Sequence, residues 1–217
     1  MGHPVGASLN LAGVYNKFNA CADGDNILLF EYCEAYTEVS KLLVYFGNLF
    51  YFVSSDVNHK VSDLRALHAT DKKNYNSVKS MVDYEEKNES NKKKKCFGCR
   101  TLLRLHRALL FVIELMQEVC TAPLDEQLRN IARSVYDKTL AQYHPWPVRK
   151  AVGVAVYALP TREQLVCYIV QSQPSESGLL TREQCQEFLT THTLPMMRTV
   201  YNCIQTIFEK HNMLNLP

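Results

Sequence analysis

The sequence predicts an all-α protein of about eight helices. Apolar residues recur at three- and four-residue spacing through most of the chain, which is the period of an amphipathic helix. No run of alternating apolar and polar residues bounded by turn signals competes with these segments. With 217 residues, 47% hydrophobic and 21% charged, the chain suffices for one well-buried domain spanning residues 1–217.

The N-terminal part of the chain divides into three helical segments. Residues 9–22 carry apolar residues at helical spacing and end at the turn Asp23-Gly24-Asp25. Residues 27–68 form the longest helical pattern, with a bend expected near Gly47. A polar break at 69–73 separates this pattern from a short amphipathic helix at 75–86, and residues 87–95 form a lysine-rich loop.

Residues 99–116 are predicted to form a helix with two different faces. The segment is rich in Leu, Arg and Met, which favour helices, and it lacks internal Gly and Pro. Arg100, Arg104 and Arg107 lie along one stripe, whereas leucines and Phe111 fill most of the remainder. The stripe is either a solvated basic face or a ladder of cations that binds an anion.

A second segment, like the helix at residues 99–116, combines an apolar stretch with charged residues. The apolar run Leu42–Val53 passes directly into SSDVNHK, where Asp56 and Lys60 lie one helical turn apart. This run is well short of the roughly 20 residues that span a bilayer, so we expect no membrane crossing. Together the two segments predict a site for a lipid with an anionic head.

The C-terminal part contains a proline-bounded tryptophan between two helical patterns. Residues 124–143 carry a regular apolar stripe, and His144-Pro145-Trp146-Pro147 then breaks the helix and places Trp146 at the start of the next one. Residues 148–159 are almost wholly apolar and are predicted to form a buried helix.

Two capping boxes predict the starts of two further helices. Thr161 with Gln164, and Thr181 with Gln184, match the pattern in which each side chain bonds the other residue's backbone N–H. A last helix is expected from about Pro195 to His211.

Charge and cysteine content exclude several classes of protein. The net charge of +2 is too small for a general nucleic-acid binder, so affinity for anions must come from local clusters. The eight cysteines are scattered among apolar residues, and we expect most to be reduced core residues. Cys96-Phe97-Gly98-Cys99 is a lone CxxC without a partner pair, so no zinc site is expected, nor any cofactor.

Four groups of residues resemble one known family. They are Ser55-Asp56-Val57 with Lys60, Cys99-Arg100-Thr101 with the segment 104–109, Tyr143-His144-Pro145-Trp146, and the segment 158–163. As a set they resemble the glycolipid transfer protein superfamily, most closely its branch that transfers ceramide-1-phosphate. The resemblance extends from the first helix to the C-terminal Leu-Asn-Leu-Pro.

The resemblance implies a fold and a set of ligand contacts. The fold is a two-layer helical sandwich that encloses the lipid chains in a collapsible apolar pocket and leaves the head at the surface. Asp56 would accept the ceramide amide N–H, His144 would bond the amide carbonyl, and Lys60, Arg100 and Arg104 would hold the phosphate. The sugar-binding branch has Asn in place of Lys60 and Trp in place of Arg104.

A membrane contact is also implied, because transfer requires the protein to touch a bilayer. Trp146 is the expected interface residue, and the alternative is a Trp packed into the core beside Pro145. The four lysines Lys92, Lys93, Lys94 and Lys95 are either solvated charge or a contact with an anionic membrane surface. We expect a cytoplasmic monomer that binds membranes peripherally and transiently.

Other functions remain open at this point. Asp56 and His144 could form an acid–base pair of a lipid-modifying enzyme, although no nucleophile with an orienting base accompanies them. A sphingolipid sensor without net transport would need the same pocket, and the cargo could be another sphingolipid such as sphingomyelin or a glycolipid. By spacing, His106 and Arg107 either face the site or buttress it.

Overall fold

Ten α-helices account for most of the part of the chain that the computed structural model describes, residues 8–47, 50–88, 96–123 and 125–217. They are α1 (Leu11–Cys21), α2 (Leu29–Ser40), α3 (Tyr51–Thr70), α4 (Val78–Lys87), α5 (Phe97–Thr121), α6 (Leu128–Thr139), α7 (Trp146–Ala155), α8 (Arg162–Gln171), α9 (Arg182–Phe188) and α10 (Leu194–Lys210). The strands of the described residues, β1 (Ala22–Asp23) and β2 (Asn26–Ile27), pair antiparallel with Ala22 opposite Ile27.

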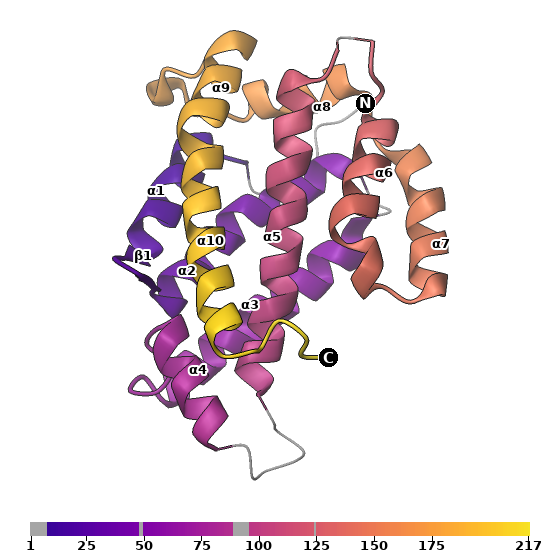
Figure 1. Ribbon diagram of the computed structural model, residues 1–217. Coiled ribbons are helices and arrows are strands. Elements are labelled where there is room, and N and C mark those ends of the chain that lie inside the picture. The colour runs from indigo at the N-terminus through magenta and orange to yellow at the C-terminus, as the bar shows by residue number, and fades with distance from the viewer. Residues whose placement is uncertain (1–7, 48–49, 89–95, 124) are drawn as a thin grey trace.

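The helices are arranged in two layers, as predicted. Helices α10, α5 and α6 lie side by side in front of α1, α2 and α3 (Figure 1). Helix α5 is the longest, and it contacts α10 and α6 in its own layer and α3 in the other. One cluster of buried apolar side chains runs from Leu9 to Met213 and includes Leu102, Leu105 and Leu109 of α5. The core therefore lies between the layers, along α5.

The segment predicted as one long helix, residues 27–68, is instead a helical hairpin. Helix α2 continues into a short 3₁₀ helix, η1 (Lys41–Phe46), and α3 begins at Tyr51 and packs back against α2. Gly47 follows η1 with a φ of 90°, a backbone conformation that residues with a Cβ rarely adopt. Gly47, which was expected to bend a continuous helix, therefore ends the helix η1.

The C-terminal helix α10 begins at Leu194, one residue before the predicted start at Pro195, which confirms the prediction. Helices α9 and α10 are joined by the π-helical turn η6 (Leu189–Thr193), so that helical backbone runs without a break from Arg182 to Lys210. Proline lacks an N–H and its ring clashes with the carbonyl four residues earlier in a regular helix. The wider π turn immediately before Pro195 accommodates that ring.

Both predicted capping boxes are present. Thr161 and Gln164 exchange side-chain bonds with each other's backbone N–H at the start of α8, and Thr181 and Gln184 do so at the start of α9. A third box, Ser77 with Ser80, starts α4.

His106 buttresses the contact between α5 and α10 and does not face outward. Its ring stacks on Tyr201 with centroids 4.1 Å apart and planes 7° apart, and Nε2 is 2.8 Å from Oε1 of Gln205. The residue is 1% exposed, and burial lowers the pKa of His106 to about 4. The imidazole is therefore neutral in the folded protein at neutral pH.

This burial predicts an acid-dependent loss of stability. Between the unfolded pKa of about 6.5 and the folded pKa, the unfolded chain binds a proton at His106 that the folded chain excludes. The stabilisation is complete above pH ~6.5 and is lost as the pH falls, by about 2 kcal/mol at pH 5. Urea unfolding at pH 7 and pH 5 measures this loss. Between these two pH values, the unfolding free energy of His106→Phe should fall by about 2 kcal/mol less than that of the parent chain. An equal loss in both proteins would contradict this.

Candidate lipid-binding site

An apolar cavity lies between the layers at the side of α5 that faces α6. Its volume is about 170 Å³, and its walls come from α2, η1, α3, α5, α6, α7 and the short 3₁₀ helix η4 (Val156–Ala158). Aliphatic and aromatic side chains form nearly all of the wall, including Phe46, Phe111 and Leu115. An engineered cavity of about 150 Å³ takes up one benzene, so a lipid chain of about sixteen carbons requires the walls to part.

His144 is the histidine in the cavity wall. It follows the 3₁₀ helix η3 (Ala141–Tyr143), and its Nδ1 is 2.9 Å from the hydroxyl of Tyr136 on α6, which also lines the cavity. Burial lowers the pKa of His144; the Asp56 carboxylate acts in the opposite direction and the Arg107 guanidinium reinforces the lowering. His144 is thus neutral at neutral pH and lies within electrostatic range of Asp56.

Asp56 and Lys60 form an ion pair on α3, as their spacing predicts. Asp56 is exposed, and the Lys60 side chain is 14% exposed. Val53 and Val57 of the same helix line the cavity. The charged pair therefore lies beside the cavity, on the helix that supplies part of its wall.

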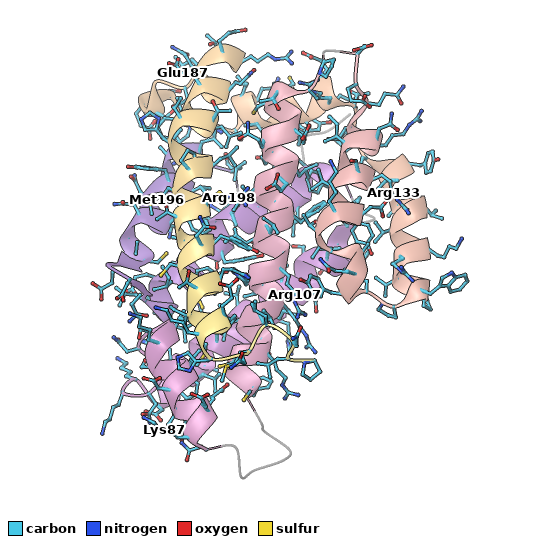
Figure 2. All side chains as sticks on the ribbon, viewed as in Figure 1. Lys87, Arg107, Arg133, Glu187, Met196 and Arg198 are labelled. Carbon is cyan, nitrogen blue, oxygen red and sulfur yellow. The ribbon has the colours of Figure 1, made fainter. Side chains whose placement is uncertain are left out.

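The arginine stripe of α5 also borders this region. Among the described residues, the guanidinium of Arg100 forms no hydrogen bond or ion pair. Arg104 is exposed and donates to the backbone oxygen of Pro217 at 3.3 Å. Arg107 donates to the carbonyl of Leu214 at 2.7 Å, and Figure 2 shows it on α5 next to the C-terminal segment. No side-chain carboxylate in the described ranges pairs with these three cations, so they are available to an anionic ligand.

Contacts between helices hold the charged groups together. The Tyr36 hydroxyl of α2 donates to the carbonyl of Leu105 on α5 at 2.8 Å, and the Asp56 carboxylate acts electrostatically on the same phenol. The five predicted head-group residues lie on α3, α5 and the segment before α7. His144 lines the cavity, and Asp56 and Lys60 lie on a helix that lines it, whereas no side-chain contact among the described residues joins Arg100 to the other four. Asp56 interacts with Lys60 and His144, whereas Arg104 interacts with the C-terminal segment.

Arg107 has the buttressing role that was one of its two predicted alternatives, whereas the role of Tyr136 was not predicted. The guanidinium of Arg107 lies 3.9 Å from the ring centroid of Tyr143, directly before His144, so Arg107 braces that segment. Tyr136 orients the His144 ring through its hydroxyl. Only the eight-residue separation of Tyr136 and His144, about two helical turns, hints at this contact in the sequence.

Helix α7 is exposed, which corrects the prediction that 148–159 is buried. In this region only Ala155 and Val156 are buried, whereas Val154 and Tyr157 are more than 70% exposed. Trp146 is 63% exposed, so the alternative of a core tryptophan was wrong. The helix remains open because no other helix covers its outer face (Figure 1).

We call one group of exposed side chains beside the cavity the apolar rim. Phe52 and Val148 line the cavity themselves, Tyr51 precedes Phe52 on α3, and the other members lie on α7 and η4, toward the face that points away from the cavity. The apolar rim consists of Tyr51, Phe52, Trp146, Val148, Val154 and Tyr157. An exposed apolar patch of this kind marks an interaction surface. The predicted membrane contacts Lys92, Lys93, Lys94 and Lys95 lie outside the described residues.

A buried carboxylate fixes the start of the arginine helix. Glu85 of α4 is 7% exposed and accepts hydrogen bonds from the backbone N–H groups of Gly98 (2.7 Å) and Cys99 (2.9 Å). A Cβ on Gly98 would lie 2.9 Å from Oε1 of Glu85 and 2.7 Å from Sδ of Met81, so α4 and α5 approach closely here. Glu85 thereby positions the first turn of α5, which carries Arg100.

The cysteine pair near this turn has no features of a metal site. Cys96 and Cys99 are buried thiols, and burial followed by the nearby Glu85 carboxylate raises the pKa of Cys99. No cluster of His, Cys, Asp and Glu in the described ranges could hold a metal ion. No helix in the same ranges is long and apolar enough to cross a bilayer.

Comparison with known proteins assigns this fold and site to a family. The family profile described as glycolipid transfer protein matches residues 27–171, more than half of the chain. The chain belongs to the glycolipid transfer protein family.

The similar proteins include ceramide-1-phosphate transfer proteins. The bovine one is 33% identical over 97% of this chain and 98% of its own length. The crystal structure of the human one in complex with 12:0 ceramide-1-phosphate has a TM-score of 0.85 at 32% identity and covers 96% of this chain and 100% of its own. The apo form of the mouse protein has a TM-score of 0.86 at 32% identity, with 96% and 100% coverage.

The buried carboxylate predicts the result of a conservative substitution. Glu85→Gln keeps the shape but replaces one acceptor oxygen by a donor that faces backbone N–H groups, so we expect a loss of about 2 kcal/mol of unfolding free energy. Urea unfolding measures it. The matched control is Glu86→Gln, whose carboxylate is exposed and contacts His211, and which should change stability by less than about 0.5 kcal/mol. Equal effects of the two would contradict the capping role.

Proposed function

We propose that this protein transfers ceramide-1-phosphate between membranes without covalent chemistry, as one lipid-transfer domain spanning residues 1–217. The observation that carries the proposal is an apolar cavity whose wall includes His144, with the Asp56–Lys60 pair on a helix that lines it and Arg107 against the adjacent Tyr143. The similar bovine, human and mouse proteins, named for this lipid, support it. The alternative of a sensor without transport is tested by the same transfer assay, in which a sensor would bind the lipid but not move it.

The tails explain why a protein is needed. At roughly 0.8 kcal/mol per CH₂, a chain of about sixteen carbons costs on the order of 12 kcal/mol to expose to water. The cavity between the layers supplies an apolar environment, and its walls separate to admit the chains. Its almost wholly apolar wall offers buried water few hydrogen-bond partners.

The head group would be held by charge-assisted hydrogen bonds. A phosphomonoester carries about −1.5 to −2 charges near neutral pH, and Lys60, Arg100 and Arg104 offer three cationic donors. Asp56 offsets one of these charges through its ion pair with Lys60, so the site nearly neutralises the ligand. A neutral sugar would leave the cations unpaired, which favours a phosphorylated lipid over a glycolipid.

The ceramide amide would lie between Asp56 and His144. The Asp56 carboxylate accepts the amide N–H. The Tyr136 hydroxyl donates to Nδ1 of the neutral His144, which leaves the proton on Nε2 to donate to the amide carbonyl. In this role Tyr136 is a positioning residue, and it fixes the tautomer that the contact requires.

An enzymatic role has less support. Asp56 is bonded to Lys60 and His144 to Tyr136, and neither contact supplies a nucleophile with an orienting base. Both groups suit recognition of a polar head, and the family is one of lipid transfer.

The apolar rim would contact the membrane during uptake and release. Trp146 combines an apolar ring with one N–H donor and favours the interface between head groups and chains. Lys150 lies 5.6 Å from the Trp146 ring centroid and would face anionic lipid heads, and Lys92–Lys95 would add to that attraction. The protein would act as a cytoplasmic monomer that binds membranes peripherally.

Removing one phosphate ligand should abolish selective transfer. In a vesicle assay, Arg104→Leu should reduce transfer of fluorescent ceramide-1-phosphate at least about tenfold, because a charge-assisted bond is lost. Arg182→Leu removes the same charge on α9, where Arg182 pairs with Glu163, and should leave transfer unchanged. A parent chain that carried glucosylceramide as well as ceramide-1-phosphate would refute the phosphate head.

Removing the exposed indole should slow transfer at the membrane step. Trp146→Ala should reduce vesicle transfer about tenfold while binding of a soluble short-chain ceramide-1-phosphate stays unchanged, because only interfacial insertion is lost. Leu180→Ala removes another exposed apolar side chain, 60% exposed and outside the apolar rim, and serves as the control. Equal slowing by both variants would argue against a specific membrane contact.

A further inference from the structure

A small cavity between α5, α8 and α9 is bordered by three side chains that carry sulfur. They are Met116 and Cys120 of α5 and Cys185 of α9, and we call the space the sulfur pocket. It lies near the end of α5 where α8 and α9 cross the molecule (Figure 1), and it shares no lining residue with the lipid cavity. The sulfur pocket is therefore separate from the site described above.

The pocket is small enough for its three sulfur side chains to reach one ion. Its volume is about 30 Å³. About 10–15 Å³ measured in this way holds one water, so a single ion also fits. Apart from Arg182 and Gln186, the other lining residues are aliphatic, which leaves sulfur as the main potential ligand in the wall.

Two helices hold the sulfur side chains toward the pocket. Met116 and Cys120 are four residues apart on α5 and therefore stand on the same face of that helix. Cys185 is the buried residue of α9. Its neighbour Gln186 donates from Nε2 to the carbonyl of Cys120 at 2.9 Å, so α9 is fixed to α5 beside the first thiol.

A buried guanidinium without a carboxylate lies next to Cys120. Arg162 is 8% exposed and donates to the carbonyls of Val119, Ala122 and Pro123, which surround Cys120 in the chain. No side-chain carboxylate among the residues that the structure describes forms an ion pair with it. A negative charge on Cys120 would therefore meet an uncompensated positive charge.

Both cysteines are protonated at neutral pH when no ligand is present. Burial raises the pKa of Cys120 to about 11, although the guanidinium groups of Arg162 and Arg182 act in the opposite direction. Burial also raises the pKa of Cys185. A metal ion removes these protons when it binds, because the thiolate and not the thiol is the ligand. The pocket thus needs a metal with a strong preference for sulfur.

The set of ligands favours copper(I) over other common metal ions. Thiolate and thioether sulfur together select copper(I). Structural zinc sites are almost always tetrahedral with four ligands from Cys, His or carboxylates, and no His, Asp or Glu lines this pocket. Calcium and magnesium require oxygen ligands. Methionine therefore serves here as the third ligand that zinc would not accept.

We propose that Met116, Cys120 and Cys185 bind one copper(I) ion through their sulfur atoms. Three copper–sulfur bonds form, both thiol protons pass to solvent, and neither the metal nor the protein changes oxidation state. Two thiolates and one monovalent cation leave one excess negative charge, which Arg162 offsets. The bound ion joins α5 to α9 without entering the lipid cavity, so the inference does not depend on the proposed function.

Anaerobic titration with copper(I) against a coloured copper(I) chelator tests the proposal on the full chain. Cys120→Ser and Cys185→Ser should each weaken binding about a hundredfold, since a thiolate ligand is lost. Met116→Leu keeps the side-chain volume and should weaken binding about tenfold. Cys167→Ser, an exposed cysteine of α8, is the matched control and should leave the affinity unchanged.

The CxxC pair is the rival copper ligand, and Cys96→Ser distinguishes the two sites. Loss of binding in Cys96→Ser with full binding in Cys185→Ser would overturn the inference. Copper(I) should also raise the Tm of the parent chain but not that of Cys185→Ser, a shift that altered folding alone does not produce.

X-ray absorption at the copper edge should show sulfur neighbours only, and nitrogen or oxygen neighbours would overturn the assignment of ligands. Equal affinity for zinc(II) would overturn the choice of metal. Lipid transfer by the parent chain should be the same with and without copper(I). A chain that transfers lipid but binds no copper(I) would refute this inference and leave the proposed function intact.

Discussion

The burial of α5 between the two layers is the constraint on which the rest of the structure depends. Its leucines pack against α10, α6 and α3, and this removal of apolar surface from water is the main driving force for folding. Once those faces are buried, Arg100, Arg104 and Arg107 must stand along the remaining edge. Burial of the apolar faces therefore sets the direction of the arginine stripe. The bonds that Glu85 accepts from the first turn of α5, and those that Arg104 and Arg107 donate to the C-terminal segment, then hold it in place.

Local signals in the sequence predicted local features reliably. The capping boxes at Thr161 and Thr181 depend on residues three apart, so the structure has them as the pattern indicated. The fold class followed from helical spacing for the same reason. The exposure of α7 could not be predicted, because an apolar helix looks the same whether or not another helix covers it. The π turn that joins α9 to α10 before Pro195 was likewise not predicted from the sequence.

For the site as well, the sequence predicted contacts between residues one helical turn apart but not contacts between other residues. Asp56 and Lys60 pair because they are one turn apart on α3. The contacts of His144 with Tyr136 and of Arg107 with Tyr143 join different parts of the chain, and spacing alone does not specify them. His106 shows the limit most clearly, since it stands between Leu105 and Arg107 yet points into the interface with α10.

The bond from Arg104 to the carbonyl of Pro217 has a consequence for how firmly cargo is retained. A guanidinium already bonded to the backbone has surrendered much of its rotational freedom, so an arriving anion meets a donor whose direction is set. The net binding free energy from Arg104 is then the difference between its bond to the anion and its bond to Pro217, and not the full strength of a new bond. This exchange keeps the affinity for the head group moderate. A moderate affinity suits the proposed transfer function, because the lipid must be released at the acceptor membrane.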